Sequence, residues 1–418
     1  MTRGIGASLA HRNFRLFFAG QLVSLVGTWM QTVAQGWLVL TLTDDPFALG
    51  VVTACQFLPV LLFGLFGGVI ADALPKRQTL IVTQIVALIL ALTLGVLVVT
   101  DQVQVWMIYL LAIGLGFVNA VEMPVRQSFV VEMVGRPDVA NAIALNSATF
   151  NLARVVGPAV AGLIIGLVGI AACFFLNAAS FLAVLVAYLL MRDSELLPSP
   201  RIAVPHSVSA IATQLREGLG YVRHTPTVRL AIVTLGVVAT AGMNFSVLVP
   251  VYAKDTLGGN ATTYGFLMAA TGAGSLTCAL MIAGGLRPTL RLLVAGAAVL
   301  GASLVTLALI KNELLALPVM LLLGWSVIAI AATTNTLIQM TVPDRLRGRV
   351  MSIYTTVFAG SSPIGGLFAG AIAAAAGVAA ALAIGGAVAI GAAAVAGVRA
   401  RAMPSSQGGP RAASQGIG

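Results

Sequence analysis

Charged residues are scarce in this chain. They make up 9% of its 418 residues, whereas a soluble protein carries roughly 25%. Cysteine and histidine are also rare, with three of each. The cysteines all fall within long apolar segments, which excludes a disulfide framework. The histidines all fall outside those segments, so we expect no histidine proton relay inside a membrane. These six residues are Cys55, Cys173, Cys278, His11, His206 and His224.

The sequence also lacks the motifs that enzymatic or ATP-driven chemistry requires. It has no phosphate-binding G-x-x-x-x-G-K-[ST] loop, which disfavours direct ATP hydrolysis. It has no H-E-x-x-H, no G-x-S-x-G and no paired aspartates or histidine within an apolar segment. We therefore expect a protein that is not an enzyme and that holds neither a cofactor nor a metal. An intramembrane enzyme stays a remote alternative, and a channel is disfavoured by the repeated organisation described below.

Apolar residues dominate what is present, at 59% of the chain, with a mean hydropathy of +1.01. A helix of about 20 apolar residues spans the ~30 Å hydrocarbon core and satisfies its own backbone. The pattern predicts an all-α membrane protein with twelve transmembrane helices. The fourth span either stops at Met123 or continues to Val131. The expected spans are 14–41, 47–71, 78–100, 104–131, 140–167, 170–191, 228–253, 261–285, 290–310, 314–340, 351–376 and 379–398.

Positive charge alternates between the connections of these spans. Of the 23 basic residues, all but Lys254, Lys311 and Arg154 fall in the termini, in every second connection, or in the ends of the spans that border them. The positive-inside rule then places both termini in the cytoplasm. An anionic inner leaflet accounts for the net charge of +10, so lipid rather than nucleic acid is the expected partner.

The chain divides into two halves. Residues 1–191 and 227–400 each hold six spans, and residues 192–226 form a linker with an amphipathic helix. The tail 401–418 is rich in Gly, Ser and Pro, so we expect it to be disordered. Weak parallels relate residues 49–54 to 264–269, and Pro158 to Pro363. Two parallel six-helix repeats favour a transporter whose site lies between the halves at the membrane midplane.

Several motifs resemble those of the major facilitator superfamily, over residues 12–400. The stretch GVIADALPKR at 68–77 is similar to the family's loop G-x-x-x-D-R-x-G-R/K-R/K, with Ala73 and Pro75 as departures. The stretch GPAVAG at 157–162 is similar to the family's antiporter motif. The runs EMPVRQ at 122–127, NAIALN at 141–146 and NLARVVGP at 151–158 resemble the branch that contains the enterobactin exporter and related drug exporters.

This resemblance implies two pseudo-symmetric halves, a monomer and a small-molecule substrate. It also implies export of an amphiphilic molecule, drug-like or siderophore-like, in exchange for protons. A proton-coupled uptake symporter for a small nutrient is the alternative. A symporter would be expected to carry more charge in the spans of its second half, and those spans are neutral here.

A polar stripe on the first span is the first candidate site. Its members repeat at three and four residues, so they share one helix face. They either line a cavity that hydrogen-bonds a ligand or form a polar seam against a neighbouring helix. Asn244 lies at a corresponding depth in the seventh span and is a further candidate. The stripe consists of Gln21, Ser24, Thr28, Gln31 and Gln35.

Ionisable residues inside the spans are the second candidate site, because such residues are costly in a bilayer. Glu122 and Arg126 share a face of the fourth span, and Arg154 lies within the fifth. We expect Glu122 and Arg154 to approach one another, since pairing reduces the cost of a buried charge. Three interpretations are open. In the first, Glu122 gains and loses a proton, and Arg154 or a cationic substrate alternates as its partner. In the second, the three residues form a permanent structural cluster. In the third, Glu122 sits at the membrane interface.

Gating is expected at the first basic loop and at the glycines and prolines of the spans. The family resemblance assigns Asp72 a latch between the halves, with Lys76 and Arg77 beside it, although Asp72 is alternatively a solvated loop residue. Gly157 and Gly162 let helices approach closely and slide, although packing alone also explains such glycines. Pro158 and Pro363 bend helices five and eleven during a rocking motion.

Overall fold

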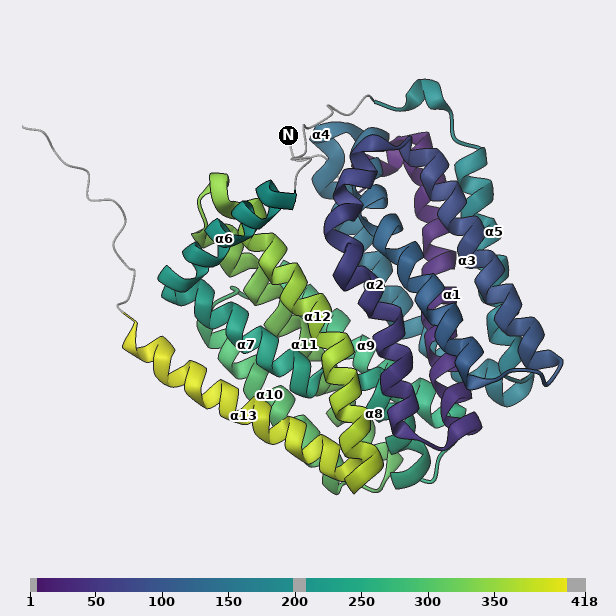
Figure 1. Cartoon of the computed structure of the whole chain (residues 1–418), viewed down its shortest axis with the longest axis vertical. Coiled ribbons are helices and arrows are strands. Elements are labelled where there is room, and N and C mark those ends of the chain that lie inside the picture. Colours follow the sequence, from purple (N-terminus) through teal and green to yellow (C-terminus); the bar gives the residue numbers. More distant parts are fainter. Residues whose placement is uncertain (1–5, 198–207, 404–418) are drawn as a thin grey trace, which may run out of the picture.

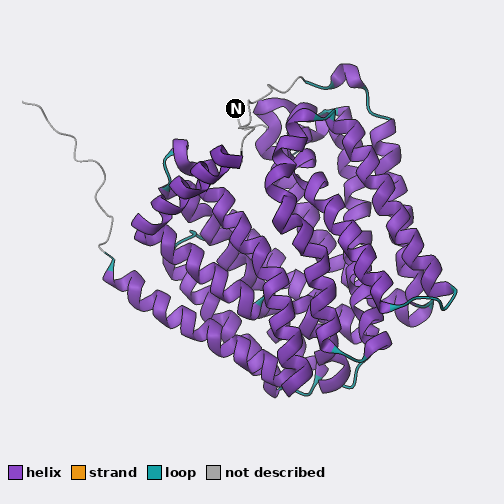
Figure 2. Cartoon of the chain, viewed as in Figure 1, coloured by secondary structure: helices purple, strands orange, loops and turns teal. Residues whose placement is uncertain are grey.

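The computed structural model is built of helices (Figures 1 and 2). It describes residues 6–197 and 208–403, although the side chains of 65–73 and 208–215 lie outside the description. No strand occurs in these ranges. Within the same ranges, eleven helices are long and apolar enough to cross a membrane. One of them contains two of the predicted spans, so the prediction of twelve spans is confirmed.

The first half consists of a short 3-10 turn and five helices, of which the fourth is bent. Helix α4 runs from Val105 to Leu167 and bends at Gly135, whose φ of 70° lies in the region that favours glycine. The helix therefore continues past Met123, and Glu122 lies in its interior rather than at its end. The elements are η1 (Ala7–Ala10), α1 (Arg12–Thr43), α2 (Pro46–Ala73), α3 (Lys76–Val99), α4 (Val105–Leu167) and α5 (Ile170–Leu189).

The second half follows the linker helix and departs from the expected spans at two places. The seventh span is interrupted at Met243 and Asn244. The eleventh begins at Asp344 rather than 351, because an acidic residue in the first turn stabilises the start of a helix. The elements are α6 (Val208–His224), α7 (Pro226–Gly242), α8 (Phe245–Val251), the turn η3 (Tyr252–Thr256), α9 (Ala261–Ala283), α10 (Leu290–Leu309), α11 (Glu313–Thr341), α12 (Asp344–Ala376) and α13 (Val378–Ala402).

The two halves meet at one end of the molecule and diverge toward the other (Figure 1). We name the end that holds the start of α1 and helix α6 the linker end, and the opposite one the far end. The largest apolar cluster joins both halves through residues such as Leu38 and Leu267. Toward the linker end the halves have separate cores, one around Phe17 and Phe129 and the other around Val228. The halves therefore share a core only away from the linker end.

Glycines make the contact between the halves close. A Cβ at Gly50 of α2 would lie 2.5 Å from the carbonyl oxygen of Gly366 in α12. A Cβ at Gly265 of α9 would lie 2.5 Å from the carbonyl oxygen of Pro158 in α4. These backbones touch with no room for a side chain, as in other closely packed membrane helices. The pairs α2–α12 and α4–α9 form the two seams between the halves.

Helix α6 occupies the linker and belongs structurally to the second half. Glu217 forms an ion pair with Arg349 of α12, Gly218 packs against Ile353, and Val222 is buried. The apolar stripe predicted for its first two turns lies outside the described side chains. The linker therefore attaches to the start of α12.

Candidate substrate and proton-coupling site

The polar stripe of α1 faces the interior of the first half over most of its length. Gln21, Gln31 and Gln35 are each less than a tenth exposed. Gln31 accepts a hydrogen bond from Asn177 Nδ2 of α5 at 2.6 Å. Thr28, which is half-buried, donates to the carbonyl of its own helix. At Gln31 the stripe therefore forms a polar seam that holds α1 against α5, rather than the lining of a cavity.

Gln21 belongs to a buried cluster with the charged pair of α4. Arg126 Nη1 donates to Glu122 Oε1 at 3.3 Å and to Gln21 Oε1 at 3.2 Å. Glu122 is 8% exposed, and the fully buried hydroxyl of Tyr188 lies close enough to interact electrostatically with both charges. Gln21 Nε2 and the Tyr188 hydroxyl are both buried, and the hydroxyl also interacts with the Gln21 side chain. The cluster is thus compact, with one carboxylate, one guanidinium and two further polar side chains.

The expected approach of Glu122 to Arg154 is wrong for this conformation. Glu122 pairs with Arg126, four residues along the same helix, a spacing at which side chains meet readily. Depth explains the difference. Glu122 is 17 residues from the far end of α4 at Val105, or ~26 Å, whereas Arg154 is 13 residues from Leu167, or ~20 Å. The two side chains therefore lie at different levels.

Arg154 instead lies against aromatic rings. Its Cζ atom is 5.5 Å from the ring centroid of Trp29 in α1, and Trp29 packs edge-on against Phe150 at 5.7 Å. The side chain is half-buried and its Nε atom is fully buried. Among the described residues it has neither an acidic partner nor a hydrogen-bond acceptor. A charged guanidinium is therefore held by a ring alone.

The backbone of Arg154 also takes part in the α4–α9 seam. A Cβ at Gly272 of α9 would clash with the carbonyl oxygen of Arg154. Closer to the linker end on the same face of α4, Asn151 is half-buried and Ser147 is exposed. This face of α4 is thus more exposed at Ser147 than at Arg154.

Asn244 lies at the break between α7 and α8. It is 4% exposed, its Nδ2 donates to the Thr240 carbonyl at 2.8 Å, and it packs against Gly365 of α12. Sequence reasoning did not single out its neighbours as polar candidates. Ser246 Oγ lies 3.5 Å from Thr53 Oγ1 across the halves. The buried Tyr264 hydroxyl, which lacks a partner in the described ranges, lies near Gly36 of α1.

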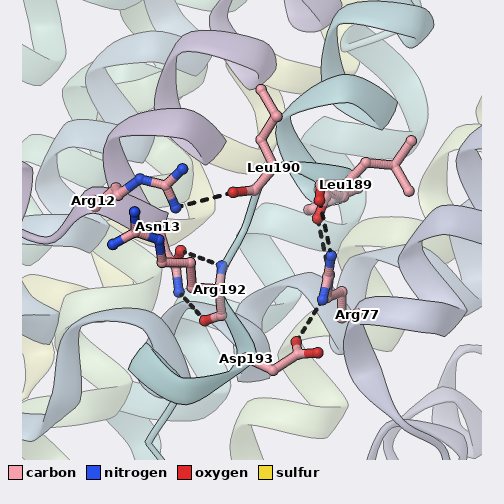
Figure 3. Close-up of polar contacts among 8 residues, drawn as sticks. Arg12, Asn13, Arg77, Leu189, Leu190, Arg192 and Asp193 are labelled. Carbon is pink, nitrogen blue, oxygen red and sulfur yellow. Dashed lines mark hydrogen bonds and ion pairs between the residues drawn. The ribbon is translucent and has the colours of Figure 1, made fainter.

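The basic residues of the first loop bind within the first half. Lys76 Nζ pairs with Glu132 Oε1 at 2.5 Å. Arg77 donates to the carbonyls of Tyr188 and Leu189 and pairs with Asp193, so it holds the C-terminus of α5 (Figure 3). A cation there also complements the helix dipole. The side chain of Asp72 lies outside the described residues, so its predicted latch stays a prediction.

The candidate gating residues lie at two different kinds of contact. Gly157 packs against Trp29 within the first half, whereas Gly162 packs against Thr262 across the halves. Pro158 and Pro363 are buried in α4 and α12. At the far end, the halves are also joined by an ion pair between Lys254 Nζ and Asp44 Oδ1 at 2.6 Å.

Comparison with known proteins agrees with this architecture. The sequence model of a family described as "Transmembrane secretion effector" matches residues 4–414. The multidrug efflux pump Tap of Mycolicibacterium fortuitum is 29% identical over 377 residues, which cover 87% of this chain and 89% of that protein. The enterobactin exporter EntS of Escherichia coli O1:K1 / APEC is 25% identical over 369 residues, covering 87% and 86%.

A solved structure has the same fold. The inward-facing, occupied form of a bacterial homologue of the human lysosomal transporter Spinster superposes with a TM-score of 0.74. The two sequences are 14% identical, and the match covers 93% of this chain and 96% of the other.

Proposed function

Because this chain belongs to the major facilitator superfamily, whose members are transporters and not enzymes, we propose that it exports a small amphiphilic molecule in exchange for protons. The proposed location is the bacterial inner membrane, and the proposed mechanism is alternating access by a monomer. Relatives named as an efflux pump and as an exporter support the direction of transport.

In the proposed orientation, the linker end faces the cytoplasm. Its support is the distribution of charge, since the basic residues of the termini and of alternate connections gather there. The conformation described above is then open to the cytoplasm and closed at the far end by the shared core and the α2–α12 seam. A substrate would enter from the cytoplasm between the halves.

The observation that carries the proposed proton coupling is the buried pair of Glu122 and Arg126. A carboxylate in a membrane helix is retained at a cost, and here an arginine compensates it. Protonation of Glu122 would remove that partner and release Arg126 to a new position. The competing interpretation is that Glu122, Arg126 and Gln21 form a permanent structural cluster.

Proton-driven transport and probe-for-probe exchange, measured separately, distinguish the coupling role of Glu122 from a purely structural one. The test uses Glu122→Gln in proteoliposomes with a fluorescent amphiphile. The matched control is Asp101→Asn, which neutralises an exposed carboxylate in the α3–α4 connection. We expect wild type and control to concentrate the probe when a proton gradient is imposed and to lose that ability with a protonophore. Glu122→Gln should lose gradient-driven transport but keep probe-for-probe exchange, which moves no net proton.

Gradient-driven transport that survives in Glu122→Gln would refute the coupling role. A variant with lower thermal stability and neither transport mode would instead support the structural interpretation. If the probe moves across the membrane in the same direction as the protons, rather than in the opposite direction, the protein would be an uptake symporter.

A further inference from the structure

The charges inside the helices do not balance. Among the described membrane-crossing helices, only three charged residues lie more than two turns from a helix end or from the bend at Gly135. They are Glu122, Arg126 and Arg154. Glu122 and Arg126 compensate each other, so the interior carries one excess positive charge, on Arg154. An uncompensated cation at this depth is costly, which makes it a candidate for function.

We propose that Arg154 binds the anionic group of an amphiphilic substrate, such as a carboxylate. This inference names the substrate class and rests on the proposed export function only in taking the ligand to be the transported molecule. An arginine presents a planar fork of donors that matches a carboxylate or phosphate group. Here Nε is buried and has no acceptor in the part of the chain that the structure describes. A bound anion at the accessible part of the guanidinium would compensate this charge.

The surroundings of Arg154 suit the apolar body of such a molecule. Trp29 and Phe150 pack edge-on beside the guanidinium, and Phe150 is 44% exposed. The exposed ring of Phe150 and the half-buried ring of Trp29, next to a half-buried cation, form a site with one apolar and one charged part. An amphiphile with an aromatic or aliphatic body and one negative group matches both parts.

Position leaves the Arg154 side chain partly exposed in this conformation. The backbone of Arg154 contacts α9, and toward the linker end on the same face of α4 Asn151 is half-buried and Ser147 is exposed. Asn151 Oδ1 is also buried without a partner in the described structure. A substrate coming from the linker end would therefore pass this polar face before it reaches the guanidinium.

The same geometry disfavours a cationic substrate. Glu122 is the carboxylate that a cation would need, and it already accepts from Arg126. A cation would have to displace Arg126 and would add to the excess positive charge of Arg154. The expectation that Glu122 alternates between an arginine and a cationic substrate is replaced here by an anion bound at Arg154.

The test compares two probes that differ by one charge. Purified protein in dodecyl maltoside is titrated with dansylglycine, a carboxylate, and with the neutral dansylglycinamide, and binding is followed by energy transfer from tryptophan. We expect wild type to bind the carboxylate at least about 10-fold more tightly, since a hydrogen bond to a charged group contributes on the order of that factor. Equal affinity, tighter binding of the amide, or no binding of dansylglycine by wild type would overturn the proposal.

Variants assign the preference to Arg154. Arg154→Gln should remove it and leave the amide affinity unchanged, and Arg154→Lys should keep part of it. The matched control Arg136→Gln removes an exposed arginine of the same helix and should behave as wild type. A preference that persists in Arg154→Gln would overturn the proposal. If Arg154→Gln does not fold, the proposal is still tested by the affinities of wild type for the two probes and by the reduced preference expected of Arg154→Lys.

A lipid phosphate has the same chemistry as a substrate anion, and nanodiscs distinguish the two. Binding of dansylglycine should be the same in phosphatidylcholine alone and with added phosphatidylglycerol. Displacement by phosphatidylglycerol would assign Arg154 to a lipid headgroup and overturn its role toward substrate. No proton gradient is present in these titrations, so failure of the proposed coupling at Glu122 would leave their result unaffected.

Discussion

Adding one methyl group at the seam between α2 and α12 should shift the equilibrium between the conformations that are closed and open at the far end. In Gly50→Ala the new Cβ would lie 2.5 Å from the carbonyl oxygen of Gly366 and 3.2 Å from the Cα atom of Leu367. Both neighbours are backbone atoms and cannot rotate away. Overpacking of this kind costs about 1–3 kcal/mol. The cost arises only when the halves are closed at the far end, because the contact crosses between them.

We therefore expect Gly50→Ala to shift the population toward a conformation that is open at the far end. A cost of 1–3 kcal/mol corresponds to about a 5- to 150-fold change in the ratio of the two conformations. Spin labels at Asp101→Cys and Lys311→Cys, in exposed far-end connections of the two halves, should report a longer distance by pulsed electron resonance.

Gly391→Ala is the matched control, because a Cβ there meets no atom within 4 Å. It makes the same chemical change in a helix of the second half and should leave the distance distribution as in wild type. An unchanged distribution in Gly50→Ala, with normal folding, would refute the reasoning. It would mean that the α2–α12 seam persists in every conformation of the transporter.

Three further changes separate stability from conformation. Asn177→Ala should leave Gln31 buried without its partner and lower the free energy of unfolding by about 1–3 kcal/mol, which thermal denaturation checks. Gly324→Ala should also lower the melting temperature, but without a change in the far-end distance, because its Cβ would clash with the backbone oxygen of Thr271 in α9, within the same half. Asp44→Asn should break the ion pair with Lys254 and lengthen the far-end distance in the same direction as Gly50→Ala. That shift should amount to no more than about 1 kcal/mol and should vanish at high salt, because the pair is exposed.

Hydropathy predicted the elements well because the bilayer requires length and apolarity of every span. Apart from the interrupted seventh span, each expected span coincides with a helix or with one arm of α4. The largest disagreement at a helix start is seven residues, where the polar chain before Met351 already belongs to α12. The break at Met243 and Asn244 was not predicted, although Gly242 is the last residue of α7 directly before it. Beside the break, Asn244 packs against Gly365 of α12.

The site was harder to predict because periodicity gives a face but not the neighbour of that face. The spacing of Gln31 and Gln21 correctly put them on one side of α1, yet their partners come from α5 and α4. The need to compensate a buried charge predicts that Glu122 has a basic partner, but it does not say which one. The partner is Arg126, one turn along the same helix, and not Arg154 of the other arm of α4. Helix spacing alone also could not show that Trp29 lies over Arg154.

Helix α1 connects the two proposed sites. Gln21 binds the Glu122–Arg126 pair in the first arm of α4, and Trp29 lies against Arg154 in the second arm, eight residues or ~12 Å further along α1. An anion at Arg154 would compete with Trp29 for the guanidinium, whereas a proton at Glu122 would release Arg126 from its carboxylate. Both events change contacts between α1 and α4. Exchange of substrate for proton then requires no direct contact between the two ligands, because each acts on the packing of the same helix pair.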